Sequence, residues 1–86
     1  MQSIIEGEIM AIGFILITTD PGREQDVRDS LDNIELVSNR WMLFGEFDLI
    51  ARVQADDESL LTRCIVEQIR TIDGVSDTRT LLGAEL

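Results

Sequence analysis

The sequence predicts an α+β fold of 86 residues, in which strands and helices follow the order βαββαβ. Three observations lead to this prediction: apolar β-prone runs, two amphipathic segments with helical spacing, and a Gly-containing connection between two of the runs. Two β-α-β halves with short connections are typical of a ferredoxin-like sandwich. In that architecture a four-stranded antiparallel sheet carries both helices on one face.

The first strand is predicted over residues 9–19, a run of β-prone residues without polar alternation. A strand that is apolar on both sides must be covered on both faces of its sheet. The two helices cover one face only, so we expect the sheet to dimerise through the other. Gly13 weakens such a strand unless a backbone or a large ring packs closely against it.

An amphipathic helix of about three turns is predicted next. Its apolar positions repeat at spacings of four and three residues: Val27, Leu31 and Ile34. Asp20 is expected to cap the helix and Pro21 to occupy its first position. Asn33 is expected to end it, before the second strand.

The hairpin between the second and third strands is the segment around which the fold is organised. Apolar runs flank Gly45, Glu46, Phe47 and Asp48, and Gly45 is expected to supply the positive φ that reverses the chain. Asp48 stands where the third strand begins. A carboxylate there needs hydrogen-bond partners or contact with water.

A second helix is predicted from a cap at Asp56 or Asp57 to about Ile72. Its apolar stripe consists of Leu61, Cys64, Ile65, Ile69 and Ile72. Gly74 is expected to end it in the left-handed conformation. The last strand, residues 75–82, then places Thr78 and Thr80 on one face and Arg79 on the other.

Composition excludes several classes of function. Seventeen acidic residues face seven Arg, giving a net charge of −10 that repels nucleic acid, so we expect no direct nucleic-acid binding. No apolar run approaches the roughly 20 residues of a membrane helix, and residues 1–8 carry no positive charge to open a signal peptide. The single Cys64 has no partner for a disulfide. We expect a cytoplasmic protein without membrane contact.

The chain offers few side chains suited to catalysis, because it contains no His, Tyr or Lys and no nucleophile elbow. Metal-ligand spacings are missing, and the glycines are isolated rather than grouped in a phosphate loop. We therefore expect no enzyme, no catalytic residue, no metal and no cofactor. An enzymatic alternative would depend on Asp48, Glu46 or Arg52 alone.

Ligand binding is easier to derive from the hairpin. Backbone N–H groups beside Gly45 can face a carboxylate while the Asp48 carboxylate holds an ammonium, so Gly45–Asp48 can grip a zwitterion. Thr78 and Thr80 add hydroxyls if the last strand runs nearby. In the alternative interpretation Gly45 is a turn residue and Asp48 a hydrogen-bonded turn carboxylate.

The order of these motifs resembles the RAM (regulation of amino-acid metabolism) domain of the Lrp/AsnC regulators. The most specific parts are the Gly-x-x-Asp hairpin at Gly45–Asp48 and the Gly-Val-x-x-Thr-x-Thr stretch that contains Thr78 and Thr80. The resemblance covers residues 10–82. It divides the chain into an N-terminal extension, residues 1–9, and a RAM domain, residues 10–86. The sequence resembles a stand-alone RAM protein that lacks the helix-turn-helix domain.

The resemblance implies a non-enzymatic sensor of a small amino acid or related metabolite. Dimers in this family join through their sheets and assemble into octamers or decamers, with effectors between dimers. It implies that Gly45, Glu46, Phe47, Asp48, Thr78 and Thr80 contact the effector. Phe14 or Leu16 of a neighbouring dimer would line the apolar side of the effector site. Trp41 and Met42 are expected in the core or in an interface rather than in that site. Co-assembly with full-length Lrp/AsnC regulators is the alternative role.

Overall fold

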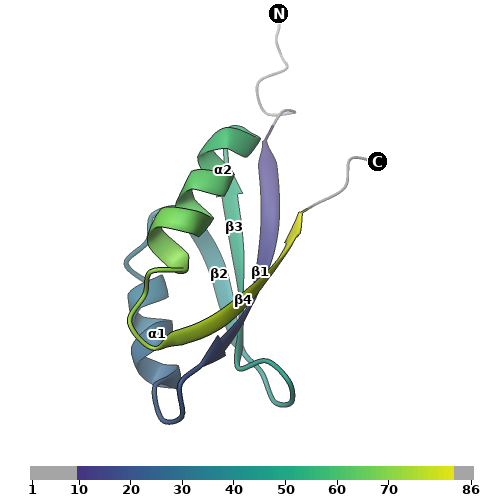
Figure 1. Ribbon diagram of the computed structural model, residues 1–86. Coiled ribbons are helices and arrows are strands. Elements are labelled where there is room, and N and C mark those ends of the chain that lie inside the picture. Colours follow the sequence, from purple (N-terminus) through teal and green to yellow (C-terminus); the bar gives the residue numbers. More distant parts are fainter. Residues whose placement is uncertain (1–9, 83–86) are drawn as a thin grey trace, which may run out of the picture.

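The computed structural model describes residues 10–82 and shows a four-stranded antiparallel sheet with its helices on one face (Figure 1). The strand order is β2-β3-β1-β4, as a ferredoxin-like βαββαβ chain requires, so the predicted fold class is confirmed. The predicted N-terminal extension, residues 1–9, and the last four residues of the predicted domain lie outside the described residues.

Strand β1 (Ala11–Thr19) is central and pairs antiparallel with β3 (Leu49–Ala55) on one side and β4 (Val75–Leu82) on the other. Strand β2 (Val37–Met42) pairs with β3 at the edge. Residues alternate between the two faces of β1, and the helix-facing Ile15 is fully buried. Its neighbours in register are Ala51 and Thr80.

The core lies between the sheet and the helices α1 (Glu24–Leu31) and α2 (Glu58–Cys64). Six of the eight predicted apolar positions are buried in it: Val27, Leu31, Leu61, Cys64, Ile65 and Ile69. The other two, Ile34 and Ile72, lie beyond the helical segments and are only partly buried. Burial also raises the pKa of the Cys64 thiol, because a thiolate is poorly solvated there. Cys64 therefore acts as a small apolar core residue.

The predicted start of the first helix is wrong. Helix α1 begins at Glu24, and the preceding Arg23 provides no side-chain cap. Asp20 belongs instead to a turn in which its carbonyl accepts a hydrogen bond from Arg23 N at 3.0 Å. Gly22 adopts a positive φ of 83° in that turn, which delays the helix beyond Pro21.

The second helix begins as predicted and ends earlier than predicted. The Asp57 side chain accepts a hydrogen bond from Leu60 N at 2.8 Å and so caps α2. The helix then widens into a π-helical segment, η2 (Ile65–Ile69), closed by the bond from Arg70 N to Ile65 O. It ends at Ile69 rather than near Ile72. Gly74 has the expected positive φ, at 103°.

Gly13 is explained by close packing, although neither a backbone nor a ring provides it. A Cβ at this position would lie 3.4 Å from Leu61 Cδ2 and 3.5 Å from Leu82 Cδ2. The missing side chain lets α2 and the end of β4 approach β1.

Both helices of the described residues lie on one face of the sheet, and the second face carries none of them (Figure 1). We call it the open face. Pairing register and alternation place six large apolar side chains on it: Ile12, Phe14, Leu16, Trp41, Ile50 and Leu81. Trp41 is 43% exposed and Leu81 is 50% exposed. Within residues 10–82 the helices cover one face only, as predicted, and dimerisation through the open face stays a prediction.

Candidate functional site

The β2–β3 hairpin folds back onto the end of the central strand. Leu43 N donates to Asp48 O at 2.9 Å across the loop, and Asp48 N donates to Ile17 O at 2.8 Å. Gly45 has a φ of 114°, a conformation that side chains strain. The expected role of Gly45 in reversing the chain is confirmed.

The Asp48 carboxylate fixes this loop to β1. Its Oδ2 accepts hydrogen bonds from Thr19 N at 2.8 Å and from Thr19 Oγ1 at 3.2 Å. Thr19 is only 7% exposed, so these bonds satisfy polar groups that are shielded from water. Oδ1 makes no hydrogen bond within residues 10–82. Oδ2 of Asp48 thus has a structural role, and Oδ1 has no hydrogen-bond partner among the described residues.

A pocket of about 350 Å³ opens beside the hairpin. It is lined by Glu24, Gln25, Met42, Leu43, Phe44, Gly45 and Asp48. The structure therefore brings Gly45 and Asp48 together, as predicted. Glu24 and Gln25 were not predicted, because only the folding of α1 against the hairpin brings them here. Met42, expected in core or interface, is 44% exposed and lines this pocket.

The two middle residues of the loop lie outside that lining. Phe47 instead approaches Arg79, whose guanidinium carbon lies 5.4 Å from the centre of the phenyl ring. This distance permits a cation–π contact. Phe47 thereby connects the hairpin to β4, and Glu46 does not line the pocket beside the hairpin.

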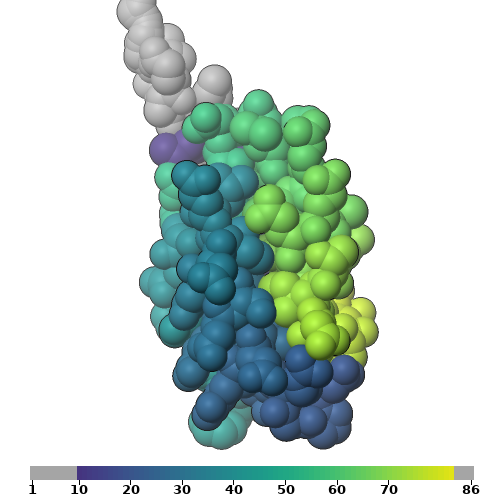
Figure 2. All heavy atoms as spheres, turned by 90° about the vertical axis from the view of Figure 1, so that its left-hand side faces the viewer, coloured from purple at the N-terminus to yellow at the C-terminus, as the bar shows by residue number. Residues whose placement is uncertain are grey.

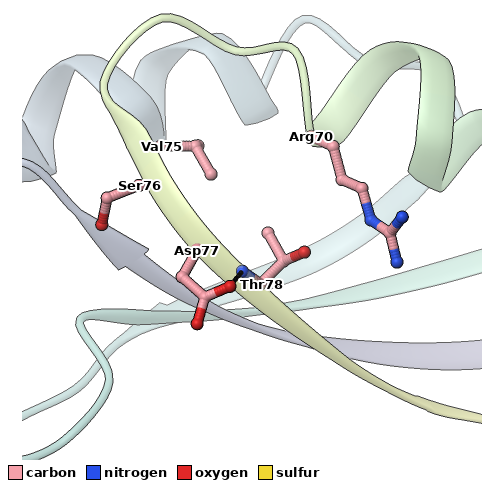
Figure 3. A pocket seen from close by; sticks show the side chains of 5 residues that line it. All are labelled: Arg70, Val75, Ser76, Asp77 and Thr78. Atoms are coloured by element: carbon pink, nitrogen blue, oxygen red, sulfur yellow. Dashed lines mark hydrogen bonds between the residues drawn. The ribbon is translucent and has the colours of Figure 1, made fainter.

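The β4 pocket is a separate cavity of about 370 Å³. Figure 3 shows its five lining residues: Arg70, Val75, Ser76, Asp77 and Thr78. Thr78 thus lies in a pocket, but a different one from Gly45 and Asp48. Thr80 lines neither, and its hydroxyl is buried without a hydrogen-bond partner in the part of the chain that the structure describes.

The two pockets do not merge within one chain. Strand β1 separates β3 from β4, which puts their axes about 10 Å apart at the usual strand spacing. Figure 2 shows the helix-covered face, where α1, α2 and the start of β4 form a continuous surface. One subunit therefore does not assemble all six predicted residues into one cavity.

Ion pairs join several charged side chains on the surface of the described residues. Arg40 binds Asp32 through two hydrogen bonds of 3.0 Å and lowers the pKa of that carboxyl. Arg23 bridges Asp26 and Asp73.

No cluster of potential metal ligands occurs among residues 10–82, and no helix described there is long and apolar enough to cross a membrane.

The sequence matches the family model of the Lrp/AsnC ligand binding domain over residues 12–83. The chain belongs to this family. Its members bind ligands and are not enzymes, which confirms the non-enzymatic prediction.

Relatives of known sequence or structure agree with this assignment. An uncharacterised HTH-type transcriptional regulator of Pyrococcus horikoshii is 31% identical over 73 residues, covering 81% of this chain and 49% of the relative. The chain thus spans about half the length of the curated relatives it matches. The crystal structure of FFRP-DM1 is 31% identical with a TM-score of 0.82 and covers 86% of this chain and 99% of that one.

A second solved structure is also matched over nearly all of its length. A hypothetical protein from Pyrococcus horikoshii is 30% identical with a TM-score of 0.81, and the match covers 88% of this chain and 92% of that chain. AsnC of E. coli shares the fold, with a TM-score of 0.84 at 17% identity. That match covers 100% of this chain and 60% of the AsnC chain. The family therefore supports a regulatory, ligand-binding role.

Proposed function

We propose that this protein is a sensor that binds a small amino acid or related metabolite between the subunits of a homo-oligomer. Its membership of the Lrp/AsnC ligand-binding family carries the proposal. A fold neighbour at 16% identity is a transcriptional regulator of Neisseria meningitidis in complex with L-Met, which supports an amino acid as the class of ligand. The sensor would act in the cytoplasm, in transcriptional or metabolic regulation.

The hairpin pocket supplies the first half of the proposed site. Asp48 Oδ1 accepts no hydrogen bond within the described residues and would take the ammonium group of the ligand, while Oδ2 keeps Thr19 in place. The backbone from Gly45 through Glu46 and Phe47 would face the carboxylate. This pocket is of the size that small ligands occupy.

The second half of the site would come from another subunit. Because neither Thr78 nor Thr80 lines the hairpin pocket of its own chain, a second copy would be needed to bring these residues to that pocket. A ligand held by two copies stabilises their interface by mass action. Binding would therefore change the state of assembly.

The open face supplies the first contact between copies. Its six apolar side chains lie in water in a single chain, and a two-fold symmetric dimer would cover all of them at once. Dimers would then join into an octamer or a decamer.

Titration calorimetry with the twenty amino acids, in salt because the chain is strongly acidic, tests the ligand. We expect one or a few to bind. Asp48→Asn keeps an acceptor for Thr19 but removes the charge, so we expect binding to weaken about tenfold or more. Binding equal to that of the wild type would show that Asp48 is structural only, and no heat with any amino acid would contradict the sensor.

Thr19→Val is the matched control for that variant. It removes the 3.2 Å hydrogen bond to Asp48 and keeps the carboxylate. We expect the free energy of unfolding to fall by about 1 kcal/mol with ligand affinity retained. Thermal melts measured beside the calorimetry separate loss of fold from loss of charge.

Co-assembly with full-length Lrp/AsnC regulators is the second candidate function. It is favoured by relatives that are HTH-type regulators of about twice the matched length. A mixed ring would carry fewer DNA-binding heads. Pull-down from extract of its own cells would recover a helix-turn-helix protein if this role is real, and recovery of none would contradict it.

A further inference from the structure

Arg70 is a cation without a side-chain partner in the described residues. Five of the seven arginines have neighbours there that engage them: Arg23, Arg28, Arg40, Arg52 and Arg79. Arg63 and Arg70 form no ion pair or side-chain hydrogen bond within residues 10–82. In a chain with 17 acidic residues, an unengaged guanidinium at the edge of a pocket is available to an external anion.

The geometry around Arg70 suits a small anion. Arg70 follows the last turn of η2, and its side chain reaches toward β4 (Figure 3). The Thr78 hydroxyl lies on the same side of the strand and forms no hydrogen bond within the described residues. Both groups line a cavity of about 370 Å³, which is large enough for a molecule the size of an amino acid.

We propose that the β4 pocket binds the carboxylate group of a small molecule, with Arg70 as its cationic partner and the Thr78 hydroxyl as a second donor. A guanidinium presents two parallel N–H groups that match the two oxygens of a carboxylate. The identification of the ligand as an amino acid rests on the proposed function. The binding of a carboxylate group is argued from this pocket alone.

The Asp77 side chain leaves β4 on the side opposite the Thr78 hydroxyl and Arg70 (Figure 3). Its Oδ1 accepts a hydrogen bond from Thr78 N at 2.9 Å. Asp77 therefore does not face the guanidinium across the pocket, and the two proposed donors are left to the carboxylate.

Nuclear magnetic resonance of the ¹⁵N-labelled protein tests the proposal with three probes at constant ionic strength. Acetate carries the carboxylate alone, methylammonium carries the ammonium alone, and glycine carries both. We expect acetate and glycine to shift the Arg70 Nε–H and Thr78 amide signals, and methylammonium to leave Arg70 unmoved.

Arg70→Gln should weaken acetate binding, read at the Thr78 amide, about tenfold or more. Arg63→Gln is the control, because Arg63 has the same charge but lines another pocket beside Glu58 and Glu67. The proposal is overturned if acetate moves neither signal in the wild type, or if Arg70→Gln binds acetate as the wild type does.

The two proposals fail in different ways. If acetate binds through Arg70 but calorimetry finds no amino-acid ligand, the carboxylate site stands and the sensor fails. If amino acids bind equally to the wild type and to Arg70→Gln, the sensor stands and the Arg70 site is overturned.

Discussion

Asp48 has a structural role in the fold and is the residue that we propose holds the ammonium group of the ligand. Oδ2 holds Thr19 at the end of the central strand, and Oδ1 accepts no hydrogen bond within the described part of the chain. The sequence already required partners for a carboxylate at the start of a strand. It did not identify Thr19, which lies 29 residues away and reaches Asp48 only through the pairing of β1 with β3.

The surroundings of Arg70 could not be predicted from the sequence pattern. Its position in the amphipathic pattern predicts an exposed residue, and the structure agrees. Whether an exposed arginine meets a carboxylate or an open pocket depends on how η2 ends and how β4 passes it. No spacing rule contains that information.

The pair of Arg40 and Asp32 gives a pH-dependent prediction. The Arg40 hydrogen bonds lower the pKa of Asp32 in the folded protein, so their stabilisation is present above the unfolded pKa, about 4, and is lost as the pH falls through the folded value. Arg40→Gln should lower the free energy of unfolding at neutral pH. We expect the difference from the wild type to vanish in strong acid.

Urea unfolding at a series of pH values measures this difference. Arg63→Gln is the control, because it removes an arginine that forms no ion pair within residues 10–82. The difference in the free energy of unfolding between this variant and the wild type should not vary with the protonation of Asp32. If the corresponding difference for Arg40→Gln is constant across the whole pH range, the ion pair is contradicted.

At the scale of elements, hydrophobic period and turn residues predicted the order of strands and helices. The Asp57 cap and the left-handed Gly74 followed from residue type and position. The start of α1 did not, because Pro21 fits both a helix start and a turn, and Gly22 favoured the turn. The π-helical segment η2 could not be predicted, because apolar spacing in the sequence does not distinguish a bond to the fifth preceding residue from the usual bond to the fourth.

Gly74 and Gly22 form a matched pair that tests close packing at a turn. Both have positive φ, so alanine strains either by about 1–2 kcal/mol. A Cβ at Gly74 would also lie 3.1 Å from Arg23 Cβ and from Val27 Cγ2, whereas one at Gly22 meets nothing within 4 Å. Gly74→Ala should therefore lower the free energy of unfolding more than Gly22→Ala. Equal losses in urea unfolding would contradict this contact.

At the scale of the whole molecule, the distribution of apolar residues separates two kinds of surface. One face of the sheet has its helices, and the open face keeps large side chains such as Phe14, Trp41 and Leu81 in contact with water. The unbroken apolar run of the first strand predicted this second face. The sequence could not predict which copies meet across it, because a pattern within one chain carries no record of its neighbours.

Leu81 and Leu60 allow the open face to be tested without disturbing the core. Both are exposed, at 50% and 38%, but Leu81 lies on the open face and Leu60 on α2. Leu81→Arg should prevent the proposed dimer from forming, because it would place an unpaired charge in the interface between the copies. Leu60→Arg should leave the assembly as it is.

Sedimentation of the unmodified protein at micromolar concentration shows whether copies of the chain cover the open face. We expect a dimer or larger assembly and no folded monomer. We also expect the fluorescence of Trp41, the single tryptophan, to shift to the red when dilution separates the copies. A well-folded single subunit at that concentration would show that the open face does not drive assembly.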